Sequence, residues 1–162
     1  MERIPINMER ISINITEQEG NAMAYYGKYI HTLDAANRLI VPSRFREALG
    51  PEAVLYNSYD GGIFVYDQAA FDALQEQNQE LNETEAGRAM LRRFYQDVRT
   101  VSIDRSGRFV MPQECIEHAG LKNEIVVLGV GKRIEVWDLE RYDANVGDPD
   151  TLPQSDYPTY RF

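Results

Sequence analysis

The sequence predicts an α+β fold in which two similar half-domains are joined by a helical middle segment. The first observation is an internal repeat: residues 34–42 (DAANRLIVP) align with residues 104–112 (DRSGRFVMP) at an offset of 70. Two copies at so long a period indicate duplicated half-domains rather than a solenoid. The second observation is that each copy combines strand-like segments with a short helix. The third is a longer helical pattern between the copies.

Each copy is predicted to begin with a strand, a turn and a return strand, at residues 29–33, 34–38 and 39–41 in the first copy and at 98–103, 104–108 and 109–111 in the second. The strand segments are rich in β-branched and aromatic residues. Asn37 and Gly107 occupy the same place in the two turns. Because Asn and Gly best tolerate a left-handed backbone, we predict a positive φ at both positions.

A short helix and two further strands complete each copy. Pro42 and Pro112 suit the first turn of a helix, where a missing N–H costs little, and Gly50 and Gly120 suit its C-terminal end. The predicted helices are 43–49 and 113–119, and the predicted strands are 53–57, 63–66, 124–128 and 133–137. Turns are predicted at 60–62 and 129–131.

The middle segment, about 68–96, has a helical pattern in two parts. Its apolar residues are Phe71, Leu74 and Leu81 in the first part and Met90, Leu91, Phe94 and Tyr95 in the second. A break is predicted at 82–84, with Thr84 as the N-cap of the second part. These apolar stripes indicate core or subunit contacts rather than a cofactor site.

The charge of the chain is unevenly distributed. The 162 residues carry a net charge of −9, which excludes a uniformly basic nucleic-acid coat. Residues 28–46 nevertheless sum to +3 and residues 99–113 to +2, whereas 72–85 hold five acids and no base. Two basic patches on an acidic chain are compatible with an anionic partner at a defined surface, but the charge pattern alone favours ordinary scatter of surface charge.

The pattern of reactive residues argues against an enzyme. Cys115 is the single cysteine, which excludes a disulfide framework and a cysteine-rich zinc site and suits a reducing cytosol. Cys115 and His118 have the spacing of a nucleophile pair, but no third orienting group is evident. No phosphate-binding glycine loop or metal-ligand set is present. We predict no catalysis, metal, cofactor, small-molecule substrate, membrane span or secretory signal.

The paired Asp-x-x-x-Arg motifs, each followed by three apolar residues and a proline, resemble those of the MraZ family. Residues 129–131 (GVG) and 134–138 (IEVWD) close the second copy in the same manner. The family belongs to the AbrB/SpoVT-like group of swapped-hairpin DNA-binding proteins, and the resemblance covers about 23–142. Two departures are Asn37 in place of the usual Gly and the segment 1–22 before the usual start.

The resemblance implies two tandem AbrB/SpoVT-like swapped-hairpin half-domains that form a small β-barrel-like core with intervening helices. The implied boundaries are a flexible extension at 1–24, repeat 1 at 28–74, a helical linker at 75–98, repeat 2 at 99–142 and a flexible acidic tail at 143–162. The implied function is a cytoplasmic, nucleoid-associated transcriptional regulator. It would bind direct repeats in double-stranded DNA upstream of the division and cell-wall gene cluster, as a ring-shaped homo-oligomer.

Arginines beside the two turns are the candidate DNA contacts. Arg38 and Arg108 each follow a carboxylate, Asp34 or Asp104, by four residues. The pair can clamp the turn, or the arginine can bind guanine or phosphate. We predict that the aspartates clamp the turns, that Arg38 is the main DNA contact and that Arg108 is secondary. The residues predicted to contact phosphate, or else to be ordinary surface charges, are Lys28, Arg44, Arg46, Arg99 and Arg105.

An alternative from a different class is an oligomeric scaffold that binds protein partners without reading DNA. The segment 142–162 holds Tyr142, Tyr157, Tyr160 and Phe162 among prolines and acids, which suits a flexible docking segment. Salt-sensitive DNA binding favours the regulator, and its absence favours the scaffold.

Overall fold

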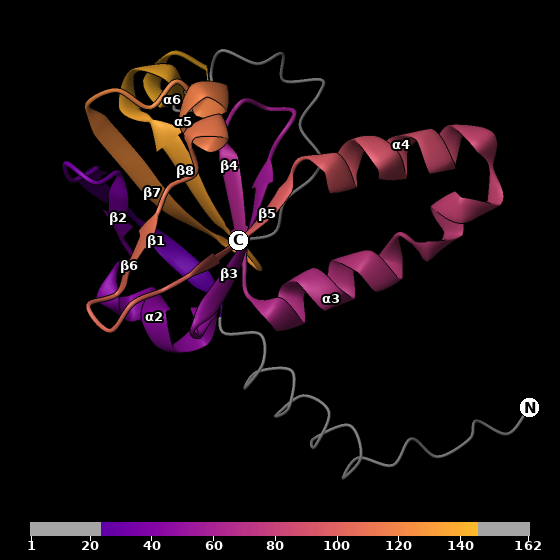
Figure 1. The fold of residues 1–162 in the computed structure, drawn as a ribbon, viewed down its shortest axis with the longest axis horizontal. Coiled ribbons are helices and arrows are strands. Elements are labelled where there is room, and N and C mark those ends of the chain that lie inside the picture. The colour runs from indigo at the N-terminus through magenta and orange to yellow at the C-terminus, as the bar shows by residue number, and fades with distance from the viewer. Residues whose placement is uncertain (1–23, 146–162) are drawn as a thin grey trace, which may run out of the picture.

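The computed structural model describes residues 24–145, which form an α+β unit with a projecting helical arm (Figure 1). The predicted extension at 1–24 lies outside the described residues except for Ala24, and so does most of the predicted tail, from residue 146 onward. The strands are β1 Tyr25–Thr32, β2 Arg38–Ile40, β3 Glu52–Asn57, β4 Ile63–Tyr66, β5 Val98–Ser102, β6 Arg108–Val110, β7 Glu124–Gly131 and β8 Ile134–Asp138. The helices are α2 Ser43–Leu49, α3 Gln68–Gln77, the 3-10 helix η1 Gln79–Glu83, α4 Glu85–Gln96, α5 Gln113–Ala119 and α6 Leu139–Asn145.

The two repeats exchange strands with each other. Six antiparallel strands form one sheet in the order β1-β7-β8-β4-β3-β5, and β2 and β6 form a separate two-stranded sheet. The first strand of repeat 1, β1, therefore pairs with β7 of repeat 2, and the first strand of repeat 2, β5, pairs with β3 of repeat 1. The equivalent strands β4 and β8 pair with each other, as do β2 and β6. This exchange confirms the predicted swapped-hairpin fold.

One hydrophobic core holds the swapped elements together. It contains residues from both return strands and both short helices, including Leu39, Phe45, Phe109 and Cys115, which are at most 3% exposed. Phe45 of α2 also packs edge-on against Tyr25 and Tyr29 of β1. Because neither repeat buries these side chains alone, the two halves depend on each other for stability.

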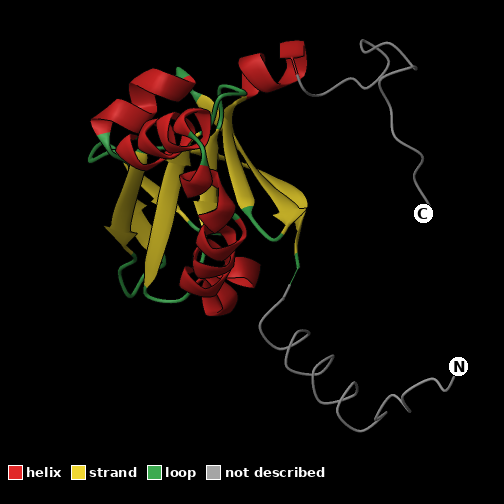
Figure 2. Ribbon diagram, turned by 90° about the vertical axis from the view of Figure 1, so that its right-hand side faces the viewer, coloured by secondary structure: helices red, strands yellow, loops and turns green. Residues whose placement is uncertain are grey.

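The helical arm consists of α3, η1 and α4 and extends away from β2 and β6 (Figure 1). Figure 2 shows the arm lying in front of the curved sheet when the molecule is turned by 90°. A second apolar cluster, with Phe71 of α3 and Phe94 of α4 stacked at 6.2 Å, attaches it to β3 and β4. The predicted break is confirmed: Thr84 caps α4 by accepting a 2.9 Å hydrogen bond from the Gly87 N–H.

The predicted turn at 129–131 is wrong, because β7 continues through Gly131. Gly129 pairs with Gly27, and a Cβ at position 129 would overlap the backbone of Tyr26 on β1. Glycine here marks a close approach of two strands rather than a turn. The long β7 also explains why β1 begins at Tyr25, four residues before the predicted start.

Among the helices of residues 24–145, none has the length and apolar character needed to cross a membrane.

Candidate nucleic-acid interface

The two-stranded sheet of β2 and β6, here called the ribbon, has one buried and one outward face. Leu39 pairs with Phe109 at its centre, and both side chains point into the core. Successive strand residues point to opposite sides, so the residues on either side of this pair point outward. Those residues are Arg38, which pairs with Val110, and Arg108, which pairs with Ile40. The two arginines therefore share the outward face as diagonal neighbours, and such residues lie roughly 7–8 Å apart in antiparallel sheets.

Asp34 organises the turn before β2. One carboxylate oxygen accepts hydrogen bonds from the N–H groups of Ala36 and Arg38, both at 2.9 Å. The other accepts the Nε–H of Arg38 at 2.8 Å, which makes an ion pair. These hydrogen bonds, the backbone one to Arg38 foremost, lower the pKa of Asp34. The carboxylate therefore holds both the turn and the arginine side chain at neutral pH.

Asp104 organises the turn before β6 with the same backbone bonds but without the ion pair. Its carboxylate accepts from the N–H groups of Ser106 at 2.8 Å and Arg108 at 3.0 Å. Within the described part of the chain, the Arg108 guanidinium has no ion-pair or hydrogen-bond partner. Arg105 is a second exposed arginine in this turn, where the first turn has Ala35.

The positive-φ residues of the two turns tie the repeats to each other. Asn37 has φ 60° and Gly107 has φ 78°, which confirms the predicted left-handed backbone. The carbonyl oxygen of Asn37 accepts the N–H of Met111 at 2.8 Å, and that of Gly107 accepts the N–H of Val41 at 2.7 Å. The left-handed conformation aims each carbonyl group at the other repeat, so the turns are held from both sides.

Arg46 of α2 lies against the second turn. Its Nε–H donates to the carbonyl oxygen of Val41 at 2.9 Å, and its side chain occupies the place that a Cβ at Gly107 would take. Glycine is therefore needed at 107 for space as well as for φ, whereas Asn37 already carries a side chain. Arg46 supports the turn from within the protein.

Lys28 and Arg44 lie at the β1 edge of the large sheet. The Arg44 guanidinium stacks over the Tyr26 ring, 4.0 Å from its centroid, and also donates a hydrogen bond to the Tyr26 hydroxyl. Lys28 lies 5.0 Å from the centroid of the Tyr142 ring. Both side chains belong to exposed residues, so their charges remain available to an outside anion.

Arg99 differs from the other predicted cations because its donors are used within the protein. Its Nε–H donates to Glu114 of α5 at 2.7 Å, and its Nη1 donates to the carbonyl oxygens of Gln96 and Val98. The structure thus separates Arg99 from the free arginines of the second turn.

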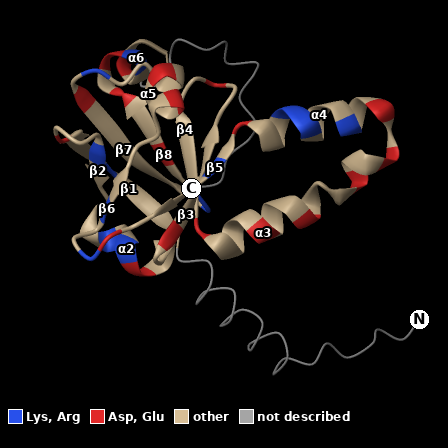
Figure 3. Cartoon of the chain, in the orientation of Figure 1, with Lys and Arg blue, Asp and Glu red and all other residues tan. Residues whose placement is uncertain are grey.

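The two short helices that follow the ribbon strands have opposite charge. Helix α2 carries Arg44, Arg46 and Glu47, whereas α5 carries Glu114 and Glu117. Figure 3 shows blue segments on α2 and at the neighbouring turn before β6, and red segments on α5. A cationic surface near the ribbon therefore combines α2 of repeat 1 with the second turn of repeat 2, which no single stretch of sequence displays.

The outward apolar residues Ile40 and Val110 are not among the residues predicted from the sequence. Val110 is 56% exposed although it lies in a strand of apolar neighbours. The signal that could have found them is their spacing: Ile40 and Val110 each lie two residues after an arginine, and strand residues two apart point to the same face.

The other chemical features lie away from the outward face of the ribbon. Cys115 is fully buried, and burial raises the pKa of its thiol to about 11. The His118 ring contacts the Ser58 carbonyl oxygen at 2.8 Å. Among the described residues, no group of three or more His, Cys, Asp or Glu side chains is placed to hold a metal ion.

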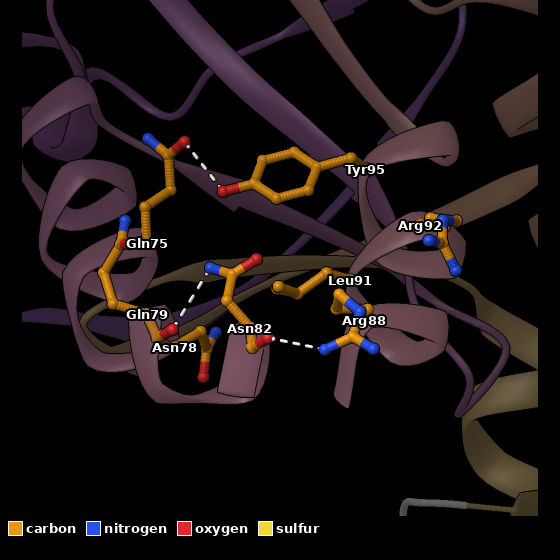
Figure 4. Close-up of a pocket in the computed structure, with 8 residues that line it drawn as sticks. All are labelled: Gln75, Asn78, Gln79, Asn82, Arg88, Leu91, Arg92 and Tyr95. Atoms are coloured by element: carbon orange, nitrogen blue, oxygen red, sulfur yellow. Dashed lines mark hydrogen bonds between the residues drawn. The ribbon is translucent and has the colours of Figure 1, made fainter. Parts of the chain in front are cut away.

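A polar hollow of about 360 Å³ lies between α3 and α4 on the arm (Figure 4). Tyr95 donates to Gln75 at 3.0 Å across it, and Arg88 donates to the Asn82 carbonyl oxygen at 2.9 Å. Its position on the arm places it on the side of the molecule away from the ribbon.

A swapped-hairpin core with a two-stranded ribbon and two Asp-clamped turns defines the tandem swapped-hairpin class of α+β proteins. The family described as "MraZ protein, putative antitoxin-like" matches residues 24–94 and again residues 94–148. The chain belongs to the MraZ family, which confirms the resemblance drawn from the motifs.

Three relatives, each named "Transcriptional regulator MraZ", illustrate the similarity. The protein of Acetivibrio thermocellus is 35% identical over 132 residues, 81% of this chain and 92% of its own length. That of Clostridium acetobutylicum is 40% identical over 73% of this chain and 84% of its own length. That of Ligilactobacillus salivarius is 40% identical over 74% and 85%, respectively.

Proposed function

We propose that this protein is a sequence-specific DNA-binding transcriptional regulator, and that the ribbon is the element that reads the DNA. The observation that carries the proposal is the pair of arginines on the outward ribbon face, fixed by the register of β2 and β6. The relatives named as transcriptional regulators support it. The proposed target is a set of direct repeats in double-stranded DNA upstream of the division and cell-wall gene cluster.

The ribbon has suitable dimensions for the major groove. That groove, about 12 Å wide, admits a two-stranded β-ribbon, and arginine binds the O6 and N7 atoms of guanine there with two hydrogen bonds. The core behind Leu39 and Phe109 keeps the ribbon rigid, and the Asp-clamped turns fix its ends. A rigid ribbon loses little conformational entropy on binding.

We assign different roles to the two arginines. Asp34 holds Arg38 by Nε and leaves its terminal nitrogens free of hydrogen bonds to described residues, so Arg38 is oriented before it meets a base. Arg108 and Arg105 have no such partner among the described residues and suit phosphate groups, which accept cations in many orientations. Lys28 and Arg44 add phosphate contacts, whereas Arg46 and Arg99 support the site from within.

One ribbon supplies few contacts, so we propose that the protein acts as a ring-shaped homo-oligomer. Several ribbons on one assembly would bind repeated DNA sites with a high effective concentration. The arm exposes Met90 (62%) and Tyr95 (43%) on the side away from the ribbon, which leaves the ribbon free when copies meet there. In this proposal the protein acts in the cytoplasm, on the nucleoid, without a cofactor or catalysis.

A gel-shift titration tests the proposal, using the duplex upstream of this chain's own gene and a scrambled duplex of equal length. We expect salt-sensitive preference for the upstream duplex, and a large oligomer by mass measurement in solution. Arg38→Ala should lose that preference while the oligomer persists. A large oligomer with no preference between the duplexes would favour the protein-binding scaffold instead.

A further inference from the structure

The outward ribbon face carries an apolar pair that the assignment of the arginines leaves unused. Four residues lie at the corners of this face. Arg38 and Arg108 occupy one diagonal, and Ile40 and Val110 occupy the other. Val110 is 56% exposed, among the largest exposures of the apolar side chains in the described chain. A single exposed valine on a protein surface is ordinary. Val110, however, lies opposite Arg38, so a duplex bound by Arg38 on this face would also contact the valine.

We propose that Val110 contacts the 5-methyl group of a thymine next to the guanine bound by Arg38, so that the ribbon selects guanine and thymine together. This inference rests on the proposed function. The thymine methyl is the apolar group on the major-groove edges of the bases, and aliphatic side chains are its usual partners. Ile40, beside Arg108, occupies the equivalent place in the other half of the ribbon.

The spacing of the ribbon matches this arrangement. Directly opposite residues such as Arg38 and Val110 have Cβ atoms about 4.5–5.5 Å apart, and residues two apart on a strand lie about 6.6–6.8 Å apart. Base pairs stack every 3.4 Å or so. A side chain opposite Arg38 therefore meets a base one or two steps from the guanine, within the same stretch of groove.

The two cross-strand pairs of the ribbon differ in how well they can contact a guanine and a neighbouring thymine methyl group together. Val110 is exposed, whereas Ile40 is half-buried beside the core residue Leu39. Arg38, opposite Val110, is oriented by Asp34, whereas Arg108 is not. The oriented arginine and the exposed valine thus belong to the same cross-strand pair, and we assign the methyl contact to that pair first.

Thymine-to-deoxyuridine replacement tests the contact, because it removes only the methyl group. Each thymine of the upstream duplex is replaced in turn, and binding of the wild-type protein and of Val110→Ala is measured by gel shift. We expect one or two replacements to weaken wild-type binding about three- to four-fold, the effect of losing one buried methyl. The same replacements should leave Val110→Ala unaffected.

Ile30→Ala is the matched control, because Ile30 is also an exposed β-branched residue (45%) but lies on β1 of the large sheet. It should respond to deoxyuridine as the wild type does. Both variants should melt like the wild type, because neither side chain is buried. The contact is excluded if no thymine replacement matters, or if Val110→Ala keeps the full effect, while the upstream duplex is still preferred. Absence of that preference overturns the proposed function itself.

Discussion

The two Asp-clamped turns share a backbone but present different charges. In each, the aspartate accepts two backbone N–H groups, and the carbonyl oxygen of a positive-φ residue accepts an N–H from the other repeat. In the first turn Asp34 also holds Arg38, which leaves the turn neutral. The second turn has a free Arg108 and an additional Arg105. The two copies therefore share the same turn backbone but differ in whether the arginine is held by the aspartate.

The strand exchange brings elements of one repeat against the turn of the other. Basic α2 follows the first turn in sequence but lies against the second, through Arg46 and Gly107. Acidic α5 instead uses Glu114 to bind Arg99. One end of the ribbon therefore combines an oriented arginine with little surrounding charge, and the other combines free arginines with a basic helix. We infer that the first end reads bases and the second attracts phosphate.

Removing Arg38 should produce the largest effect on specific binding. Losing a bidentate contact to guanine costs about 1–3 kcal/mol. Arg38→Ala should therefore weaken binding to the upstream duplex by roughly 5- to 150-fold while binding to a scrambled duplex changes little. Gel-shift titration of both duplexes measures this, with the circular dichroism melt as the control for folding. A variant that retains its preference would refute the reading role.

Substitution at the two positive-φ positions should affect stability unequally. Gly107→Ala places a Cβ in a left-handed backbone and against Arg46, so we expect a loss of about 1–3 kcal/mol of unfolding free energy. Asn37→Gly, at the equivalent place, should change it by less than about 0.5 kcal/mol. Chemical denaturation compares the two. Equal losses would mean that Arg46 does not depend on the absence of a side chain at 107.

Neutralising the two aspartates should affect specific DNA binding unequally. Asp34→Asn removes the ion pair that orients Arg38, so specific binding should fall about two- to ten-fold as that side chain becomes free to move. Asp104 makes no ion pair with Arg108, so Asp104→Asn should leave the preference for the upstream duplex unchanged. Competition binding with guanine-substituted duplexes measures both. Equal losses of specificity would contradict the orienting role of Asp34.

The smallest expected effect is the pH response of the first turn. The pKa of Asp34 is lowered by its hydrogen bonds, so its contribution is complete above the unfolded-state pKa, about 3.9. That contribution disappears only as the pH falls through the lowered pKa of the folded protein. A carboxyl ¹³C NMR titration should therefore find the Asp34 midpoint below the ordinary aspartate value. A midpoint at or above that value would mean that the turn does not hold the carboxylate.

Local features of the fold follow from the sequence, whereas contacts between the repeats do not. The positive φ of Asn37 and Gly107 and the cap at Thr84 each depend on a few neighbouring residues, and all were predictable. The place of Gly129 inside β7 depends on the approach of β1, about a hundred residues away in sequence, so local turn propensity misassigned it.

The candidate site could be predicted only in part, because several of its contacts join residues that are far apart in the sequence. The repeated motif identifies Arg38 and Arg108 as equivalent, but equivalence in sequence does not disclose that one is paired and the other free. The contact of Arg46 with Gly107 and the engagement of Arg99 by Glu114 arise from the tertiary structure. The sequence places Ile40 and Val110 on the faces of Arg38 and Arg108, but which apolar residue lies opposite which arginine is known only from the register of β2 and β6.

The most direct test of the division between the two ends is the salt dependence of binding for Arg38→Ala and Arg108→Ala on the upstream duplex. A lost phosphate contact lowers the slope of log affinity against log salt by about 1. We predict that Arg108→Ala lowers the slope by about that amount and keeps sequence preference. Arg38→Ala should keep the slope and lose the preference. The reverse pattern, or identical behaviour of the two variants, would contradict the account.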